Sequence, residues 1–404
     1  MAVVALTDGV NVGAALRIGA TLVPVIGSAR VYVCGITPYD TTHLGHAATF
    51  VWTDLAARVL HLAGAHVDVC RNVTDVDDHL LAEAKARGVT WRSLAAQETY
   101  RFERDASDLG VIRPAFEPRS HDHVDDVIAL AAGLVARGAA YERGGAVYFR
   151  GAGVHAPGDG PGHDTFASSP GGSPAPQNGT DAAPGGPHDE GSDDAESPDD
   201  VAVWHAPRDN GPTWPSPWGP GRPGWHAECA AMALSTFGAS IDLHGGGADL
   251  RFPHHAYESA MVEAFTGVSP FARSWMHVGT VRTGGRKMAK STGNLVFVHD
   301  LLQRWPAAAI RYLILARSWR DDWEFEEESL DRATRQLDDL WRSAVSTKGA
   351  TSTAGRGEAR RGVVDALLDD LDVPRSLTVA GDAGGLVLAE LLDFLGLRDT
   401  TIWY

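Results

Sequence analysis

Histidine, lysine and cysteine side chains at a few points give this chain of 404 residues the means for phosphate and metal chemistry. They fall in four short motifs, which are CGITPYDTTHLGH (34–46), PGWHAEC (223–229), FPHHAYE (252–258) and KMAKS (287–291). Each motif alone is a weak signal. Their combination and order predict a single active site that is assembled from distant parts of the chain.

The HLGH segment places two imidazoles and a glycine where a predicted strand gives way to a predicted helix. Backbone N–H groups at a helix N-terminus attract anions, and a glycine lets a ligand approach the backbone closely. His43 and His46 can then stabilise charge that develops on a phosphate. We therefore expect Gly45 and both histidines to bind ATP, accompanied by Mg²⁺, with the histidines in catalytic roles. The alternative is an accidental match at an ordinary helix start.

The KMAKS segment holds two of the four lysines in the chain, which are Lys85, Lys287, Lys290 and Lys348. It lies in a glycine-rich loop, where flexible lysines can close over a leaving pyrophosphate and neutralise its charge. We expect Lys290 to be the main catalytic cation, with Lys287 beside it. The alternative is an exposed basic loop without chemistry.

Cysteine and histidine side chains predict a zinc site formed by Cys34, Cys229 and His254. Glu258 follows His254 by one helical turn, so both side chains can face the same ion. A zinc ion with an open position binds a thiolate well and a hydroxyl poorly, which would separate cysteine from the near-isosteric serine. A closed structural zinc site is the alternative.

Two further stretches combine small residues with carboxylates at predicted strand ends, namely NVTDVDD (72–78) and GGGADL (245–250). Such groups suit ribose hydroxyls, an adenine edge or a substrate amine. For the aspartates of the first stretch, capping of the following helix is the alternative. Asp249, directly after three glycines, is better placed to meet a ligand. Trp225 is expected to pack against a bound amino acid, with ordinary core packing as its alternative.

The elements that must position these motifs begin with a strand at 30–34, a helix at 45–61 and a strand at 66–75. Such a unit favours a parallel sheet that binds ligands at the carboxyl ends of its strands. The motif residues expected there are Cys34, His43, His46 and Thr74. Further helices are predicted at 76–87, 92–108, 121–138, 306–316, 325–345, 358–370 and 385–396, with a strand at 146–149.

Changes in composition along the chain predict five regions. They are N-terminal strands in 1–29, the first half of an α/β catalytic domain with a helical insertion in 30–154, a disordered Gly/Pro/Asp-rich insertion in 155–200, the second catalytic half in 201–310 and a C-terminal helical bundle in 311–404. The run 319–326 (WRDDWEFE) is expected to join the second half to the bundle.

Composition narrows the class of protein further. There is no apolar run long enough for a bilayer and no basic N-terminal region typical of a signal peptide, so we expect a cytoplasmic protein without membrane contact. Three cysteines are too few for a disulfide framework, and Cys70 is expected in a buried strand.

The net charge is −17, and removing the ten acidic residues of 151–200 leaves −17 + 10 = −7. An acidic body argues against a nucleic-acid partner, and we expect a monomer.

These motifs resemble the class I aminoacyl-tRNA synthetase superfamily, whose HIGH-type and KMSKS-type signatures correspond to HLGH and KMAKS. Within it, CGITPYDTTHLGHAAT and NVTDVDD resemble the mycothiol-pathway cysteine ligases, which join cysteine to the amine of glucosaminyl-inositol. Cysteinyl-tRNA synthetases typically read CGPTVYD at the first position. The resemblance covers roughly residues 15 to 400 apart from the insertion. It implies an α/β fold with a class I Rossmann-type parallel-sheet catalytic domain, an insertion and a C-terminal helical bundle.

The resemblance also implies roles for individual residues and a reaction in two steps. ATP and L-cysteine would give cysteinyl-adenylate and pyrophosphate, and the amine of glucosaminyl-inositol would then attack the carbonyl and release AMP. Zinc would be bound by Cys34, Cys229 and His254. The cysteinyl group would lie against Cys34, Gly35, Ile36, Thr37 and Trp225. ATP and the adenylate would contact Thr37, Gly45, Thr49, Asn72, Val73, Thr74, Gly247, Ala248, Asp249 and Val281.

Three departures from these families leave alternatives open. Ala289 replaces the usual serine of KMSKS, Glu258 occupies a ligand position of the tRNA synthetases that the ligases generally lack, and the ligases' ERGGDP segment is absent. The chain can therefore be a paralogue that uses another amine, or a non-catalytic zinc-binding paralogue. A cysteinyl-tRNA synthetase is a further alternative, although only 404 − 291 = 113 residues follow KMAKS.

Overall fold

The computed structural model describes residues 6, 14–23, 26–39, 42–157, 194–207, 211–288, 292–346 and 352–398. Two predictions lie wholly or mostly outside these ranges. They are the catalytic role of Lys290 and the disordered insertion, of which only 155–157 and 194–200 are described.

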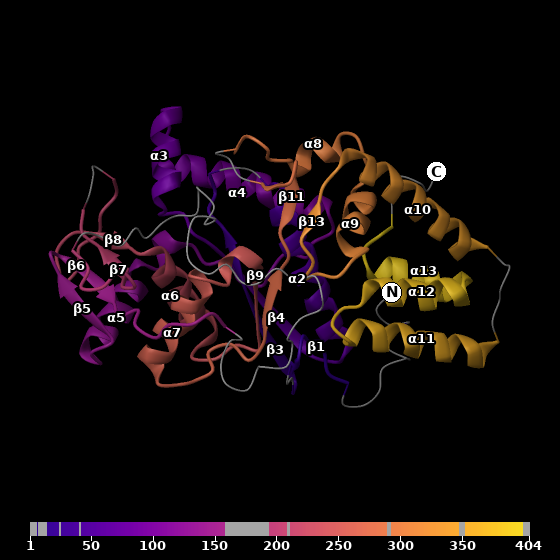
Figure 1. The fold of residues 1–404 in the computed structure, drawn as a ribbon, viewed down its shortest axis with the longest axis horizontal. Coiled ribbons are helices and arrows are strands. Elements are labelled where there is room, and N and C mark those ends of the chain that lie inside the picture. The colour runs from indigo at the N-terminus through magenta and orange to yellow at the C-terminus, as the bar shows by residue number, and fades with distance from the viewer. Residues whose placement is uncertain are drawn as a thin grey trace.

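A four-stranded parallel sheet occupies the centre of the molecule (Figure 1). Its strand order is β10 (Trp275–Val278), β9 (Leu243–Gly247), β3 (Ser28–Ile36) and β4 (His66–Val73). Helix α2 (Leu44–Leu62) connects β3 to β4, which pair in parallel. The predicted strand–helix–strand unit and parallel sheet are therefore confirmed.

Alternation along β3 divides the interior into two hydrophobic clusters. Val31 and Val33 pack with residues of α2 on one face, whereas Tyr32 and Cys34 pack with residues of α6 (Trp225–Phe237) and α7 (His254–Thr266) on the other. Because side chains of a strand alternate between faces, this register turns Cys34 toward the two helices that carry the other predicted zinc ligands.

The pairing of β3 with β4 shifts register between Val33 and Ile36. Gly35 lies inside this irregularity, and a Cβ atom placed there would be 1.7 Å from the carbonyl oxygen of Asn72. Only a glycine allows so close an approach of the two strand ends. The motif CGIT therefore begins with a backbone constraint as well as a thiol.

Two smaller sheets flank the centre. One is antiparallel, in the order β5 (Ala140–Arg143), β6 (Ala146–Phe149), β7 (Val201–His205) and β8 (Arg222–Pro223). The other has the order β12 (Arg286–Lys287), β11 (Val281–Thr283) and β13 (Trp323–Glu324). Strand β13 lies in the run expected only to join domains, so this run also supports the hairpin that leads into KMAKS.

The remaining helices follow the predicted positions, with two omissions. They are α3 (Asp78–Arg87), α4 (Trp91–Asp108), α5 (Val124–Ala136), α8 (Val298–Leu302), α9 (Ala307–Leu315), α10 (Glu327–Val345), α11 (Thr353–Leu368), α12 (Val373–Ala383) and α13 (Gly385–Phe394), with short 3-10 helices η1 (Ser120–Asp122) and η2 (Ala248–Leu250). Helices α8 and α12 were not predicted. None of the helices in the described ranges has the length and apolar composition that a bilayer span requires.

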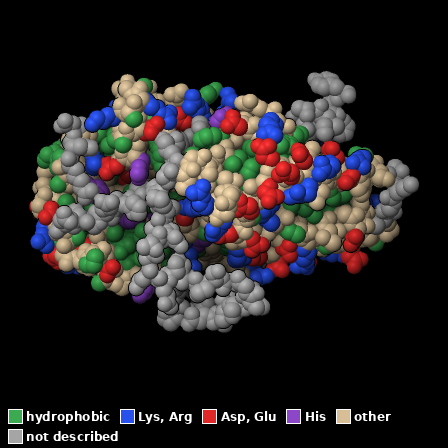
Figure 2. Space-filling model, turned by 45° about the horizontal axis from the view of Figure 1, so that its top comes forward, with side chains coloured by type: hydrophobic (Ala, Val, Ile, Leu, Met, Phe, Trp, Pro, Cys, Tyr) green, Lys and Arg blue, Asp and Glu red, His purple; other side chains and the backbone are tan. Residues whose placement is uncertain are grey.

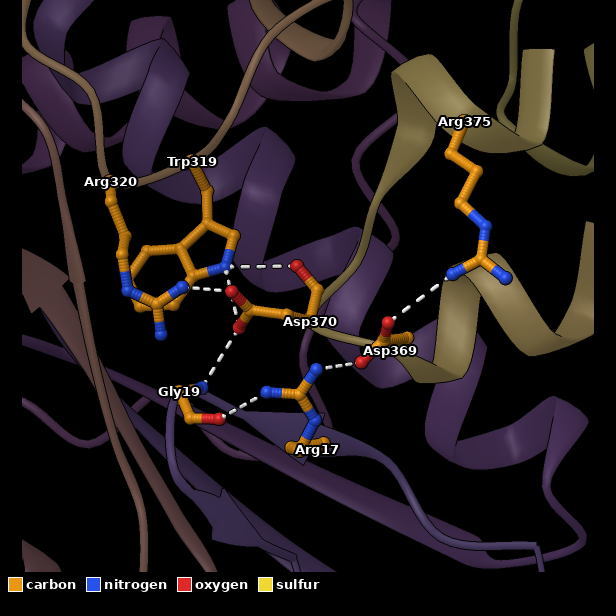
Figure 3. A network of polar contacts seen from close by, with 7 residues as sticks. All are labelled: Arg17, Gly19, Trp319, Arg320, Asp369, Asp370 and Arg375. Atoms are coloured by element: carbon orange, nitrogen blue, oxygen red, sulfur yellow. Dashed lines mark hydrogen bonds and ion pairs between the residues drawn. The ribbon is translucent and has the colours of Figure 1, made fainter. Parts of the chain in front are cut away.

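Helices α10 to α13 gather at one end of the molecule, and a polar network ties them to the N-terminal hairpin of β1 (Arg17–Ile18) and β2 (Thr21–Leu22) (Figures 1 and 3). In the turn between α11 and α12, Asp370 accepts a hydrogen bond from the Gly19 N–H at 2.8 Å and one from the Trp319 indole at 3.3 Å. Its carboxylate also pairs with Arg320. The bundle is thus joined to the segment that precedes β13.

Candidate active site and metal centre

Two thiols and an imidazole meet beside the end of β3. The ligand atoms of Cys34, Cys229 and His254 all lie within 4.8 Å of one another, and all three side chains are buried. One ring nitrogen of His254, Nδ1, is 2.8 Å from Nδ1 of His226, and the other, Nε2, has no hydrogen-bond partner among the described residues. Buried polar atoms are normally satisfied, so an orphaned imidazole nitrogen beside two thiols fits a zinc ion.

The electrostatics of this cluster also fit a cation. Burial raises the pKa of the Cys34 thiol well above its usual value and raises that of Cys229, whereas burial lowers the pKa of His254 well below its usual value. All three groups are therefore neutral in the absence of an ion. A bound divalent cation would reverse this preference for the thiols, because it favours the thiolate form.

Asn72 supports the cluster instead of facing an open pocket. Its side chain is 1% exposed, its Oδ1 accepts from the Gly35 N–H at 2.8 Å, and its Nδ2 donates to Cys229 Sγ at 3.1 Å. Its predicted contact with an adenylate remains untested. The observed contacts assign it a further role, which is to fix a candidate metal ligand to the end of β3.

Cys34 also belongs to a second buried cluster, formed with His244, His255 and Glu258. Its Sγ lies 3.7 Å from Glu258 Oε2, and His244 Nε2 lies 3.1 Å from both carboxylate oxygens of Glu258. His244 was not predicted as a site residue. The sequence feature that could have indicated it is its position directly before the GGGADL stretch. Glu258 shares a cluster with Cys34 but not with Cys229 and His254, and its role as a zinc ligand stays a prediction.

At the end of the site where the nucleotide is expected, His43 caps helix α2. Its Nδ1 accepts from the Gly45 N–H at 3.1 Å, and its ring stacks on His46 with centroids 3.8 Å apart. A Cβ atom at position 45 would lie 2.9 Å from the His43 ring, so a larger residue there would displace the imidazole from this cap. Burial lowers the pKa of His43, and lowers that of His46 to about 4. His43 is therefore neutral, with its proton on Nε2, where it can donate to a phosphate oxygen.

The first lysine of KMAKS reaches the same region. Lys287 Nζ lies 2.7 Å from Asp249 Oδ2, and its charge contributes to the lowered pKa values of both His43 and His46. Thr49 lies near this point, since a Cβ atom at Gly247 would be 3.9 Å from its Oγ1. The structure thus brings together residues of HLGH, GGGADL and KMAKS.

Other predicted residues lie between these two ends. Thr37 and Thr74 share a hydrogen bond of 2.8 Å across the ends of β3 and β4, and Trp225 packs on the His254 ring with centroids 4.0 Å apart. The Val73 N–H donates to Pro118 at 2.9 Å, so this backbone group is already satisfied. Ile36 and Val281 are buried, and Ala248 begins η2.

A parallel sheet with an HxGH helix start and a lysine-bearing hairpin defines the class I synthetase type of catalytic domain. The family described as tRNA synthetases class I (C) catalytic domain matches residues 23–335, and the chain belongs to it.

Relatives include two proteins named L-cysteine:1D-myo-inositol 2-amino-2-deoxy-alpha-D-glucopyranoside ligase. The one from Frankia casuarinae is 41% identical, over 91% of this chain and 76% of that protein. The one from Tsukamurella paurometabola is 42% identical, over 86% and 82%. A cysteine–tRNA ligase of Rhodospirillum rubrum is 38% identical, over 93% and 76%. Methionyl-tRNA synthetase of Mycobacterium tuberculosis, bound by methionyl-adenylate, shares the fold with a TM-score of 0.62 at 16% identity, over 92% and 84%.

Proposed function

We propose that this chain is an ATP-dependent, AMP-forming ligase that activates L-cysteine as cysteinyl-adenylate and transfers the cysteinyl group to the amine of glucosaminyl-inositol. The observation that carries the proposal is the buried set of Cys34, Cys229 and His254 at the end of β3. It lies at the same strand ends as the HLGH and KMAKS residues. In this proposal, the binding sites for the thiol and for the nucleotide therefore lie next to each other.

In this proposal, Cys34, Cys229 and His254 hold zinc, with Asn72 fixing Cys229. Bound zinc would supply a soft Lewis acid for the thiol of the substrate cysteine. Trp225, already packed against His254, would form an apolar wall for the cysteinyl group. Serine would be rejected because its hydroxyl is a poor ligand for such a site.

The nucleotide would bind over the start of α2. His43 Nε2–H and the helix N-terminus would donate to phosphate oxygens, and Lys287 would leave Asp249 to neutralise the departing pyrophosphate. His46 would act beside His43, and Lys290, from outside the described residues, would complete the lysine pair. Mg²⁺ would accompany ATP. Asp249 would then be released to contact the nucleotide with Gly247 and Ala248.

The most specific part of the proposal is the identity of the acceptor of the cysteinyl group. Relatives named for the amino-sugar reaction and relatives named for tRNA both match this chain, and the CGITPYD motif resembles the former. On the face in Figure 2, acidic and basic side chains are interspersed over the helical end, without a field of one sign that would attract a polyanion. We therefore propose small-molecule substrates for a cytoplasmic monomer.

The test is cysteine-dependent exchange of labelled pyrophosphate into ATP by zinc-loaded protein, run beside serine. AMP release is then followed with glucosaminyl-inositol or uncharged tRNA as acceptor. Exchange with cysteine but not serine, and AMP release only with the amino sugar, are the expected results. Transfer to tRNA would replace the acceptor assignment. Absence of exchange in protein shown to hold zinc would refute the activation step and favour a non-catalytic zinc protein.

A further inference from the structure

An aspartate–histidine pair lies at the outer edge of the site, and none of the roles above uses it. His121 Nδ1 lies 2.6 Å from Asp75 Oδ2, and the His121 backbone N–H donates to Asp75 Oδ1 at 3.1 Å. The Asp75 side chain is 1% exposed, whereas that of His121 is 23% exposed. A buried carboxylate thus holds one side of an imidazole that solvent can reach.

The fold delivers this pair to the strand ends where the site lies. Asp75 directly follows Thr74, whose hydroxyl meets that of Thr37. The segment 116–119 runs parallel to β4 through bridges to Cys70 and Val73, and it leads into η1, which contains His121. Helix η1 also contacts α6, the helix that begins at Trp225 and carries Cys229.

The geometry defines which nitrogen of His121 can react. Because Nδ1 faces the buried Asp75 carboxylate at 2.6 Å, a neutral ring carries its proton on Nδ1 and presents the lone pair of Nε2. The Asp122 carboxylate lies 3.3 Å from Nε2 and is 65% exposed, so it can turn away toward solvent. Trp91 contacts the ring edge-on at 5.8 Å between centroids, with Arg92 over its indole.

We propose that His121, held by Asp75, is the general base of the transfer step and accepts a proton from the acceptor amine. The proposal rests on the proposed function. Nε2 takes a proton from the amine nitrogen as that nitrogen attacks the cysteinyl carbonyl. The new C–N bond forms, the C–O bond to the phosphate breaks, and AMP leaves with the electron pair of that bond. Asp75 and Asp122 then stabilise the imidazolium.

The two half-reactions differ in their need for this base. Formation of the adenylate joins a carboxylate to a phosphate and releases pyrophosphate, so it requires no base for an amine. Transfer must remove a proton from nitrogen, and a positioned base typically contributes a factor of about 100 or more to such a step. Loss of His121 should therefore slow transfer and leave activation intact, which a general structural defect would not do.

The chain supplies a matched control in His123, two residues further along. Its Nδ1 also lies against an aspartate, 2.7 Å from Asp126 Oδ2, and its side chain is 21% exposed. It precedes α5 on the same short turn, so substitution there reports on disruption of the turn itself.

The experiment measures both half-reactions in zinc-loaded full-length protein carrying His121→Gln, His121→Ala or His123→Gln. Both His121 variants should retain exchange of pyrophosphate with cysteine within about twofold and lose transfer to glucosaminyl-inositol by about 100-fold. Added imidazole should partly restore transfer in His121→Ala. His123→Gln should match wild type in both assays.

Equal losses of exchange and transfer in the His121 variants, an equal loss in His123→Gln, or unchanged transfer without His121 would each overturn the assignment. Failure of the proposed function looks different. The wild-type protein itself would then leave the amino sugar unconsumed, whereas failure of the His121 assignment leaves wild-type transfer intact.

Discussion

The ammonium nitrogen of Lys287 lies 2.7 Å from Oδ2 of Asp249. The two residues come from different motifs, KMAKS and GGGADL, and their side chains are 38% and 49% exposed. Ion pairs this exposed stabilise a fold by about 1 kcal/mol at most. The lysine is therefore held at the proposed nucleotide site by a contact that would cost little to break when a phosphate competes for it.

Lys287→Ala should lower the rate of cysteine-dependent pyrophosphate exchange by about 100-fold, because removing one preorganised charge partner from a developing anion typically costs this much. The free energy of unfolding should change by less than about 1 kcal/mol. Exchange kinetics and urea titration measure the two effects. Lys85→Ala, on the exposed surface of α3, is the control and should leave both unchanged. Normal exchange in Lys287→Ala would remove this lysine from the mechanism.

Asn72→Ala should weaken metal retention and lower the free energy of unfolding by about 1 to 3 kcal/mol, because it leaves the buried contacts to Gly35 and Cys229 unmade. Zinc content after dialysis against a chelator measures the first effect. Cys70→Ala removes a buried thiol two residues before Asn72 on the same strand, outside the candidate metal cluster, and should retain zinc. Loss of zinc in the Cys70 variant, or full retention in the Asn72 variant, would contradict this account.

The Asn72 contact also shows where sequence reasoning reaches its limit. The strand pattern at 30–34 and the helical spacing after His43 sufficed to predict β3, α2 and the strand end at which Cys34 lies. The bond from Asn72 to Cys229 joins residues 157 positions apart, and no local pattern encodes it. His244 escaped notice for a similar reason, since its partner Glu258 is brought to it by the packing of α7 against the sheet.

Secondary structure was missed where local preference gave little guidance. Helix α12 has a proline in its first turn and lies between two short turns, so its pattern is brief. Strand β13 pairs only two residues with β11, and it is aligned through Asp322, which accepts from the Thr280 N–H at 2.7 Å. Such short strands depend on their partners for formation, which a single stretch of sequence does not reveal.

Arg311→Met should destabilise the protein by about 3 to 5 kcal/mol, because it removes one partner of a buried ion pair. Arg311 is fully buried, and it donates to Asp54 on α2 at 2.6 Å and to the Leu395 carbonyl at 2.6 Å. It thus joins the C-terminal bundle to the helix that begins with HLGH. Urea unfolding measures the loss.

Arg304→Ala is the control for that prediction. Arg304 makes two hydrogen bonds of 2.7 Å to Glu327, but both side chains are more than half exposed. Its loss should cost about 1 kcal/mol or less. Similar losses in the two variants would mean that burial does not set the strength of the Arg311 contact.

Asp77→Asn should change how stability depends on pH. Asp77 caps α3 by accepting from the backbone N–H groups of His79 and Leu80, and burial raises its pKa from 3.8 to about 6. The folded state therefore binds this proton more tightly than the unfolded state. The resulting stabilisation is complete below about pH 4 and disappears as pH rises through about 6.

Asparagine keeps the capping oxygen but cannot ionise, so the variant should match or exceed wild type in stability at pH 7. As pH falls from about 6 to about 4, the free energy of unfolding of wild type should rise relative to that of the variant, by up to about 3 kcal/mol for a pKa shift of this size. Urea unfolding of both proteins at several pH values measures the difference between them, in which the other titrating groups cancel. A difference that stays constant from pH 7 to pH 4 would show that Asp77 ionises in the folded protein as freely as in the unfolded chain.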